Sequence, residues 1–304
     1  MVDGALRACQ ADPSLHLLLV GPIDAAGAVL DALDPADHAR VGMLPIPDER
    51  LVDEPLAPHA ESWVESGVRT AVLAVAQGIA DAVVSAGNTA ATVTSAALGL
   101  GRWPGVRRPP LAAVLPTATG RLVLLDVGSS VDPDEETLAM HARLGAAYAA
   151  VVHEVAEPRV GLLTIGTERG KGDRLRRALP PIFTALDLPA GARYVGLVEG
   201  HDVVLGSACD VVVTDGFTGN ILLKGLETAY ATIGPPLTAG RDVPARAAIL
   251  LGVSGTVVVC HGAASGADLA AGIALAADLH RRGAVASIAA VLPKNAIPHN
   301  EVSP

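Results

Sequence analysis

Aromatic residues are scarce in this chain: Phe, Trp and Tyr make up 2% of its 304 residues, although half of the residues are hydrophobic. Ala, Val and Leu must therefore fill the interior. Lysine is also rare and occurs only at Lys171, Lys224 and Lys294, so arginine supplies most of the positive charge. The chain is long enough for a substantial core. Because no Pro-, Gly- or Ser-rich linker interrupts it, we expect one domain over residues 1–304.

Long apolar runs are missing. No stretch of about 20 residues lacks both charged residues and helix breakers, so the sequence predicts no membrane span. The nearest candidate, residues 245–260, is interrupted by Arg246, Gly252 and Ser254, and we interpret it as the end of a buried helix followed by a strand. The first residues carry Asp3 in place of an apolar segment, so we expect no secretory signal there.

Cysteine is sparse, and positive charge is in the minority. The cysteines, Cys9, Cys209 and Cys260, form no C-x-x-C pair, which favours reduced thiols and a cytoplasmic location. The net charge of −10 and the pI near 5.3 argue against a nucleic-acid-binding protein, which needs a basic surface. Nucleic acid is therefore not an expected partner.

The dominant pattern in the chain is a short apolar run, a polar loop with glycine, and then an apolar helix. It occurs at residues 81–99, 121–149, 159–179, 210–224 and 255–282, and residues 15–33 add a further copy. Continuous apolar runs that alternate with helices are typical of parallel strands buried on both faces. The sequence therefore predicts an α/β fold with three layers and a doubly wound, mostly parallel sheet.

In such folds, ligands bind where the strands end and the following helices begin. Helix N-termini offer free N–H groups that suit an anion. Lys171 could supply a counter-charge to a bound phosphate. The alternative is that these polar residues are ordinary N-caps, although the repetition of similar loops favours a shared site. The candidate phosphate and substrate ligands are Ser85, Gly87, Asn88, Thr89, Asp126, Gly128, Gly166, Gly170, Gly216, Thr218 and Gly219.

Nucleotide and metal motifs are weak. The loop around Lys171 lacks the spacing of a Walker A motif, and no G-x-G-x-x-G follows the first apolar run. The acidic run 132–136 could hold a metal, but Asp132-Pro133-Asp134-Glu135 has the form of a helix start with Pro at the first helical position, and we favour that interpretation. We expect no metal.

Cys260 and His261 are neighbours and could suggest a nucleophile with its base. Adjacent residues on a strand point to opposite faces, so we do not expect a dyad. His261 either lines the ligand site or is a capped histidine with a structural role.

Several motifs, taken in order, identify a family. They are SAGNT (85–89), GRWPGVRRPPLAAVLPT (101–117), LLDVG (124–128), GLLTIGTERGKG (161–172), VEGHD (198–202), DVVVTDGFTGNILLK (210–224) and LLGVSG (250–255). Over nearly the whole chain, they resemble the PlsX-type phosphate acyltransferases of bacterial phospholipid synthesis.

The resemblance implies that acyl-[acyl carrier protein] and inorganic phosphate react to give acyl phosphate and free carrier protein. It also implies a fold akin to isocitrate dehydrogenase and phosphotransacetylase, a homodimer, and no metal or organic cofactor. We expect phosphate to bind near Lys171 and His261 and to attack the thioester directly. Asp215 would orient Lys171 or the phosphate, and Asn88 or Asn220 would stabilise the oxyanion.

Docking of an acidic carrier protein needs a local basic patch. One candidate is Arg102, Arg107 and Arg108, and the other is Arg169, Arg174, Arg176 and Arg177. The alternative for any of these arginines is a solvated surface position.

The chain departs from the family in several places, two of which are the largest. The family's first strand and its Gly-Gly-Asp loop have no counterpart at the start, and residues 225–246 are shorter than the family's helical hairpin. That hairpin is linked to dimer packing and membrane contact, so we do not expect membrane association to carry over. Two other functions stay open: acyl transfer between coenzyme A and phosphate, and a non-catalytic module that binds an acyl carrier.

Overall fold

The computed structural model describes residues 2–21, 27, 31, 33, 35–46, 67–168, 170–234, 245–261 and 264–293. Its contacts divide the chain into two compact units, where the sequence predicts a single domain. No linker-like composition marks the division, because each unit combines segments from distant parts of the chain. The first unit comprises Met1–Gly101, Ala245–Ile249 and Val253–Arg282, and the second comprises Arg102–Pro244, Leu250–Gly252 and Gly283–Pro304.

In the first unit, three neighbouring strands follow the order β3, β10 and β9. They are β3 (Ala82–Ser85), β9 (Ala247–Leu250) and β10 (Thr256–Cys260). Strand β10 pairs parallel with β3 and antiparallel with β9. The predicted helix end within residues 245–260 is therefore wrong. Gly252, with a φ of +82°, lies in the turn between the two strands, and a reversal there lets two short apolar runs pair.

Helices lie against these strands in the first unit. Helix α9 packs on β10 and β3 and also against α1, while α3 and α4 pack on each other. The bounds are α1 (Val2–Ala11), α3 (Gly67–Ala76), α4 (Thr89–Gly99) and α9 (Gly266–Arg281). Near the N-terminus, β1 (Leu17–Gly21) and β2 (Val41–Pro45) form a separate parallel pair, and the 3-10 helix η1 (Pro35–Arg40) precedes β2.

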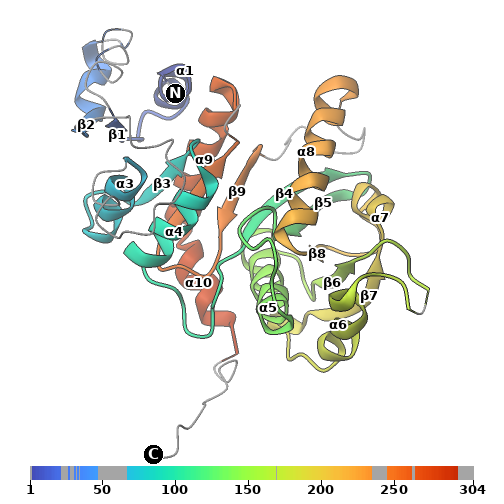
Figure 1. Cartoon of the computed structure of the whole chain (residues 1–304). Coiled ribbons are helices and arrows are strands. Elements are labelled where there is room, and N and C mark those ends of the chain that lie inside the picture. The colour runs from blue at the N-terminus through green and yellow to red at the C-terminus, as the bar shows by residue number, and fades with distance from the viewer. Residues whose placement is uncertain are drawn as a thin grey trace, which may run out of the picture. The chain divides into compact units, whose positions relative to one another are not determined.

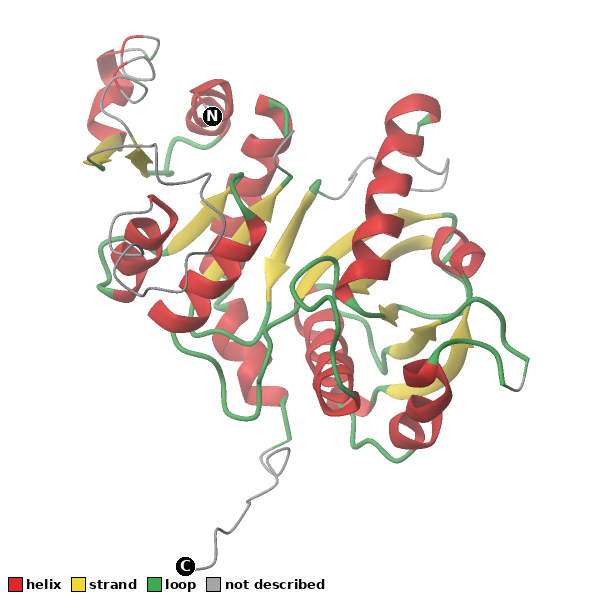
Figure 2. Cartoon of the chain, viewed as in Figure 1, coloured by secondary structure: helices red, strands yellow, loops and turns green. Residues whose placement is uncertain are grey.

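The second unit contains five strands in the order β4-β5-β8-β6-β7 (Figures 1 and 2). Only β4 and β5 pair antiparallel; β5 with β8, β8 with β6, and β6 with β7 pair parallel. This mixed, mostly parallel arrangement confirms the predicted α/β class. The bounds are β4 (Leu111–Thr117), β5 (Gly120–Leu125), β6 (Arg159–Leu163), β7 (Arg193–Val198) and β8 (Val211–Val213).

Helices cover both faces of these five strands, which is why their apolar runs are continuous. Helices α5 and α6 contact each other on one face, while α7 and α8 contact β4 and β5 from the other (Figure 1). Gly145 permits the close approach of α5, since a Cβ there would lie 2.8 Å from Leu125 and Val211. The bounds are α5 (Glu135–Val152), α6 (Arg174–Thr184), η4 (Pro189–Gly191), α7 (Gly200–Leu205), α8 (Gly216–Ile233) and α10 (Ala284–Val291).

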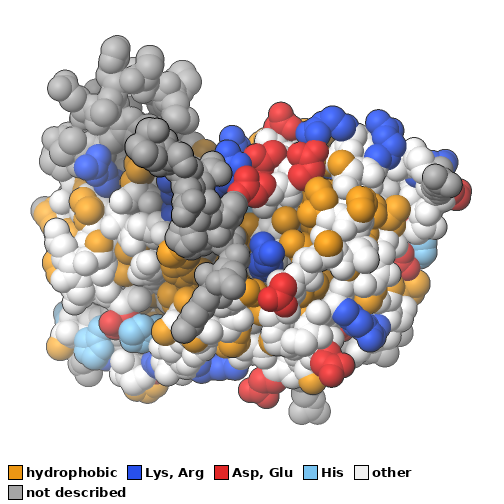
Figure 3. Space-filling model, turned by 90° about the horizontal axis from the view of Figure 1, so that it is seen from below, with side chains coloured by type: hydrophobic (Ala, Val, Ile, Leu, Met, Phe, Trp, Pro, Cys, Tyr) orange, Lys and Arg blue, Asp and Glu red, His pale blue; other side chains and the backbone are white. Residues whose placement is uncertain are grey.

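The surface mixes charge of both signs. On the face drawn in Figure 3, acidic and basic side chains lie next to one another, with exposed hydrophobic side chains between them. Among the described helices, we find none with the length and hydrophobicity that a bilayer crossing requires.

Candidate active site at the end of strand β8

The segment Thr214–Asn220 runs from the end of β8 into the start of α8, and its two glycines, Gly216 and Gly219, bring the helix against the loop that follows β5. The N–H of Gly216 donates to the carbonyl of Ser130 at 2.7 Å. A Cβ on Gly216 would lie 2.8 Å from that same oxygen, and a Cβ on Gly219 would lie 2.0 Å from the carbonyl oxygen of Asp126. Only glycine fits at these two positions. Their predicted contact with a substrate stays a prediction.

The loop after β5 is organised by the carboxylate of Asp126, which is fully buried. Its Oδ1 accepts from the N–H groups of Leu111, Gly128 and Ser129 at 3.0–3.1 Å, and its Oδ2 accepts from Ser130 at 2.5 Å. With its oxygens occupied by backbone donors, Asp126 holds this loop in place. The structure therefore places it behind the site, whereas the sequence suggested a phosphate ligand.

Asn220, on α8, forms a hydrogen bond with the same loop. Its Nδ2 donates to the carbonyl of Val127 at 2.9 Å. A Cβ on Gly128, whose φ is +143°, would lie 3.1 Å from that amide nitrogen. Asn220 and Gly128 are therefore packing partners, and the predicted role of Asn220 toward an oxyanion remains a prediction.

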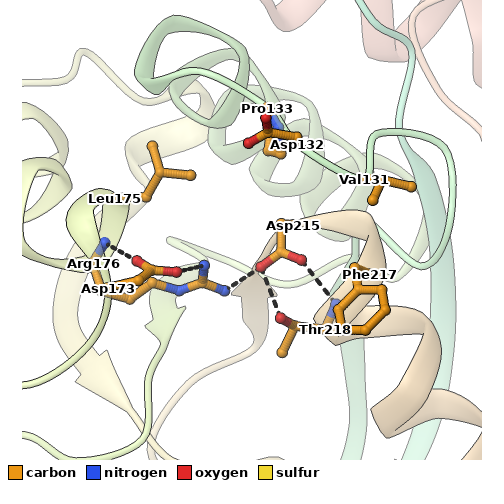
Figure 4. Close-up of a pocket in the computed structure, with 9 residues that line it drawn as sticks. All are labelled: Val131, Asp132, Pro133, Asp173, Leu175, Arg176, Asp215, Phe217 and Thr218. Atoms are coloured by element: carbon orange, nitrogen blue, oxygen red, sulfur yellow. Dashed lines mark hydrogen bonds and ion pairs between the residues drawn. The ribbon is translucent and has the colours of Figure 1, made fainter.

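A buried arginine connects the ends of β6 and β8. Arg176 is 6% exposed, and its Nη2 donates to Thr214 Oγ1 at 2.8 Å and to Asp215 Oδ2 at 2.5 Å (Figure 4). Its Nη1 donates to Asp173 Oδ2 at 2.9 Å, and its Nε to the carbonyl of Leu163 at 3.1 Å. The guanidinium is thus held between two carboxylates and two strand ends. The cation paired with Asp215 is Arg176, where the sequence suggested Lys171.

Asp215 caps the N-terminus of α8. Its Oδ1 accepts from the N–H of Thr218, and its Oδ2 accepts from the hydroxyl of Thr218, both at 2.8 Å. Burial by itself raises the pKa of Asp215, but hydrogen bonds from Thr218 and Arg176 outweigh it and hold the pKa below its ordinary value. Asp215 is therefore an ionised anchor at neutral pH and a poor proton acceptor.

A pocket of about 350 Å³ opens beside this network. Asp132, Asp173 and Asp215 contribute three carboxyl groups to its wall, and Arg176 contributes the one guanidinium (Figure 4). The lining comes from the loops after β5, β6 and β8, all at the carboxyl ends of parallel strands, as the fold class predicts. The lining residues are Val131, Asp132, Pro133, Asp173, Leu175, Arg176, Asp215, Phe217 and Thr218.

The glycine-rich loop with Lys171 leads to Asp173, which is part of the pocket lining. A Cβ on Gly166 would lie 3.4 Å from Cγ of Lys171, so the lysine stem lies over this buried glycine. Gly170 adopts a φ of +89° and is exposed. Lys171 is also exposed, and within the described chain its ammonium forms no ion pair. Two residues later, Asp173 caps α6 and lines the pocket.

The other predicted ligands lie in the first unit, at the ends of β3 and β10. The Oγ of Ser85 lies 3.0 Å from Thr92 Oγ1 and accepts from the N–H of Gly87. Asn88 Oδ1 accepts from the N–H of Ala91 at 3.1 Å, so this side chain is the N-cap of α4, which begins at Thr89. His261 follows β10 and is exposed. The pocket described above is lined by residues of the second unit alone.

The candidate docking arginines take part in contacts within the chain. Arg107 Nη1 lies 3.0 Å from Asp134 and 2.8 Å from Glu136, and Arg102 donates to the carbonyl of Arg107. Arg108 is exposed.

One arginine of the second candidate docking patch is not at the surface. Arg174 pairs with Glu135 and Arg177 is exposed, but Arg176 is buried, so its assignment to a surface patch is wrong. Arg169 lies outside the described residues. Docking of a carrier protein at either patch stays a prediction.

Sequence reasoning did not assign Arg176, Asp173 or Asp132 to this site. Arg176 lies three residues before Leu179 and seven before Phe183, both buried, so its helical spacing could have placed it on the inner face of α6. The predicted helix start near Asp132 was correct in kind, but α5 begins at Glu135 with Asp134 as its N-cap. Asp132 and Pro133 therefore precede the helix and line the pocket.

The thiols are unsuited to nucleophilic catalysis. Burial raises the pKa of Cys260 to about 11 and that of Cys209 to about 12. Cys260 is 1% exposed whereas His261 faces solvent, as the strand argument predicts. In the described ranges, no three His, Cys, Asp or Glu side chains come together as a metal site would require.

Known proteins resemble this chain in sequence and in fold. Residues 1–237 match a family described as "Fatty acid synthesis protein". A phosphate acyltransferase from Thermobifida fusca is 39% identical over 92% of this chain and 83% of its own length. One from Pseudomonas syringae pv. syringae is 36% identical over 87% of this chain and 84% of its own length.

Two solved structures share the fold. A branched-chain phosphotransacylase from Enterococcus faecalis has a TM-score of 0.58 at 13% identity and covers 88% of this chain and 99% of its own. A phosphotransacetylase from Streptococcus pyogenes has a TM-score of 0.57 at 19% identity and covers 91% of each chain. At this identity, the likeness establishes the fold alone. The sequence matches go further, and by them the chain belongs to the PlsX-type family of phosphate acyltransferases.

Proposed function

We propose that this protein transfers the acyl group of an acyl-[acyl carrier protein] thioester to inorganic phosphate. The observation that carries the proposal is the Arg176–Asp215–Thr218 network, which is fixed beside a pocket where three βα loops end. Membership in the phosphate acyltransferase family supports the reaction class. The products are an acyl phosphate and the free carrier protein.

The reaction balances without a covalent enzyme intermediate. An oxygen of the phosphate dianion attacks the thioester carbonyl carbon, the new C–O bond forms, and the C–S bond breaks. The proton carried by the phosphate passes to the departing sulfur, so the carrier leaves as a thiol. The buried thiols of Cys209 and Cys260 agree with direct transfer.

Charge divides the site into two parts. The pocket wall carries three carboxyl groups, and the guanidinium of Arg176 is already shared by Asp173 and Asp215. A phosphate dianion is repelled from such a wall. We therefore place the phosphate on the adjoining glycine-rich loop, where Lys171 offers an exposed ammonium. The neutral thioester occupies the pocket side.

The test is release of free carrier thiol from an acyl-carrier thioester, with and without inorganic phosphate. We expect release that depends on phosphate. Release of carrier thiol at the same rate with and without phosphate would overturn the proposal. Equal rates with an acyl-coenzyme A thioester, in the absence of any carrier protein, would favour the coenzyme A reaction. Binding of the acyl carrier without release would identify a non-catalytic module.

We also propose that the protein works as a homodimer through the C-terminal end of α8. In the described part of the chain, the buried residues of this 18-residue helix are Gly216 and Gly219, both in its first turn. Ile233 at the other end is 83% exposed. A second copy that packs on this end would remove Ile233 from water and leave Phe217 and Ile221, in the first two turns, accessible. Sedimentation should show a dimer that Ile233→Glu weakens; a monomer at micromolar concentration would contradict the proposal.

A further inference from the structure

Besides its charged groups, the pocket has exposed apolar side chains in its lining. Val131 is 63% exposed and Phe217 is 60% exposed, although both are apolar and both line the pocket. In Figure 4, these two side chains lie on one side of Asp215, and the Arg176–Asp173 pair lies on the other. We call the side with Val131 and Phe217 the apolar half of the pocket; the side beyond Asp215 holds the Arg176–Asp173 pair together with Leu175.

The exposed position of Phe217 has no local structural explanation. It lies between the buried glycines that seat α8, and helix initiation is already secured by the N-cap Asp215. The chain has only two phenylalanines, and the other, Phe183, is 1% exposed in the core of the second unit. An exposed aromatic ring in the lining of a pocket, in so aromatic-poor a chain, is typical of a binding contact.

The apolar half continues along the helix. Ile221 lies four residues after Phe217, and side chains at this spacing share a helix face. It is 58% exposed. One helical turn separates the two positions by about 6 Å along the helix axis, so the apolar surface extends for several methylene groups away from the pocket.

We propose that Val131, Phe217 and Ile221 bind the alkyl chain of the acyl group and set the chain-length preference of the enzyme. This inference rests on the proposed function. An anion is disfavoured by the three carboxyl groups of the pocket, whereas a neutral alkyl chain meets apolar surface at no electrostatic cost. Each methylene that Phe217 or Ile221 covers strengthens binding by about fourfold.

The experiment compares acyl-carrier thioesters of increasing chain length. In the wild-type protein, kcat/KM should rise with chain length. In Phe217→Ala, the ratio of kcat/KM for long over short chains should fall by about tenfold, carried mainly by KM. Val131→Thr keeps the shape of the side chain but adds a hydroxyl, and it should lower the ratio by about threefold. Ile79→Ala is the matched control, since Ile79 belongs to the first unit, is 63% exposed and is not part of the pocket lining.

The outcomes separate the inference from the proposed function. If Phe217→Ala retains the wild-type dependence on chain length, the inference is overturned even though the reaction stands. If the wild-type protein shows no phosphate-dependent release, the proposed function fails. Calorimetric titration with acyl carriers of different chain length then decides the inference: chain-length-dependent affinity that Phe217→Ala removes supports it, and its absence overturns it.

Discussion

The Nη2 atom of Arg176 lies 2.5 Å from Oδ2 of Asp215, and the two side chains are only 7% and 9% exposed. This pair joins α6 to the N-terminus of α8 and holds the ends of β6 and β8 together. A buried ion pair of this kind contributes more to the placement of groups than to net stability, but breaking it leaves a charge without a partner.

Removal of the buried cation should therefore be costly. We expect Arg176→Ala to lower the free energy of unfolding by about 3–5 kcal/mol and to abolish acyl transfer, because Asp215 would be left buried and unpaired. Urea unfolding and the release assay measure the two effects. Arg177→Ala, at the next residue but exposed, is the control for the unfolding measurement alone. Equal stability of the two variants would show that the pair does not hold the site.

Low pH should lower the free energy of unfolding, because the Asp215 carboxylate becomes protonated. Hydrogen bonds hold the pKa of this carboxyl below its ordinary value of 3.8, so its stabilising contribution is present above that pH. The contribution disappears as the pH falls through the lowered pKa of the folded state. Asp215→Asn should flatten the loss of stability in this acidic range, measured by urea unfolding from pH 6 to about pH 2. A loss as steep as in the wild type would assign it to other carboxyl groups.

Two glycines of α8 provide a matched pair of substitutions. A Cβ at Gly219 would lie 2.0 Å from the carbonyl oxygen of Asp126, so Gly219→Ala should displace the loop after β5 and cost about 1–3 kcal/mol. Gly225, in the same helix, has open space around its added Cβ, and Gly225→Ala should stabilise by up to about 1 kcal/mol. Thermal unfolding and the release assay compare them. If both variants behave alike, close packing does not explain Gly219.

Lys171 is the cation that we assign to phosphate. Lys171→Ala should lower turnover by at least about 100-fold, the effect typical of losing one charge-stabilising donor. Lys224→Ala, an exposed position on α8, should leave turnover unchanged. An unaffected rate in Lys171→Ala would remove this residue from the site. Dependence of the residual rate on phosphate concentration distinguishes weaker phosphate binding from slower chemistry.

Local patterns in the sequence determined the class of fold and the position of the site loops. Period and composition are sufficient for this, because a buried parallel strand, a polar loop and a helix each have their own signature. The motif TDGFTGN also indicated a strand end that leads into a capped helix, and Asp215 is that cap. The proposed reaction came from the family resemblance and not from these local patterns.

The tertiary structure decided which residues meet. Arg176 and Asp215 are 39 residues apart, and they pair only because β6 and β8 are neighbours in the sheet. Asp126 holds backbone N–H groups from both β4 and its own loop, because β4 and β5 are paired. Such pairings depend on strand order and on the depth of each side chain, and no local pattern carries that information. The sequence thus determined the class of fold and most of the strand-to-helix segments, whereas packing alone decided that a buried arginine anchors the site.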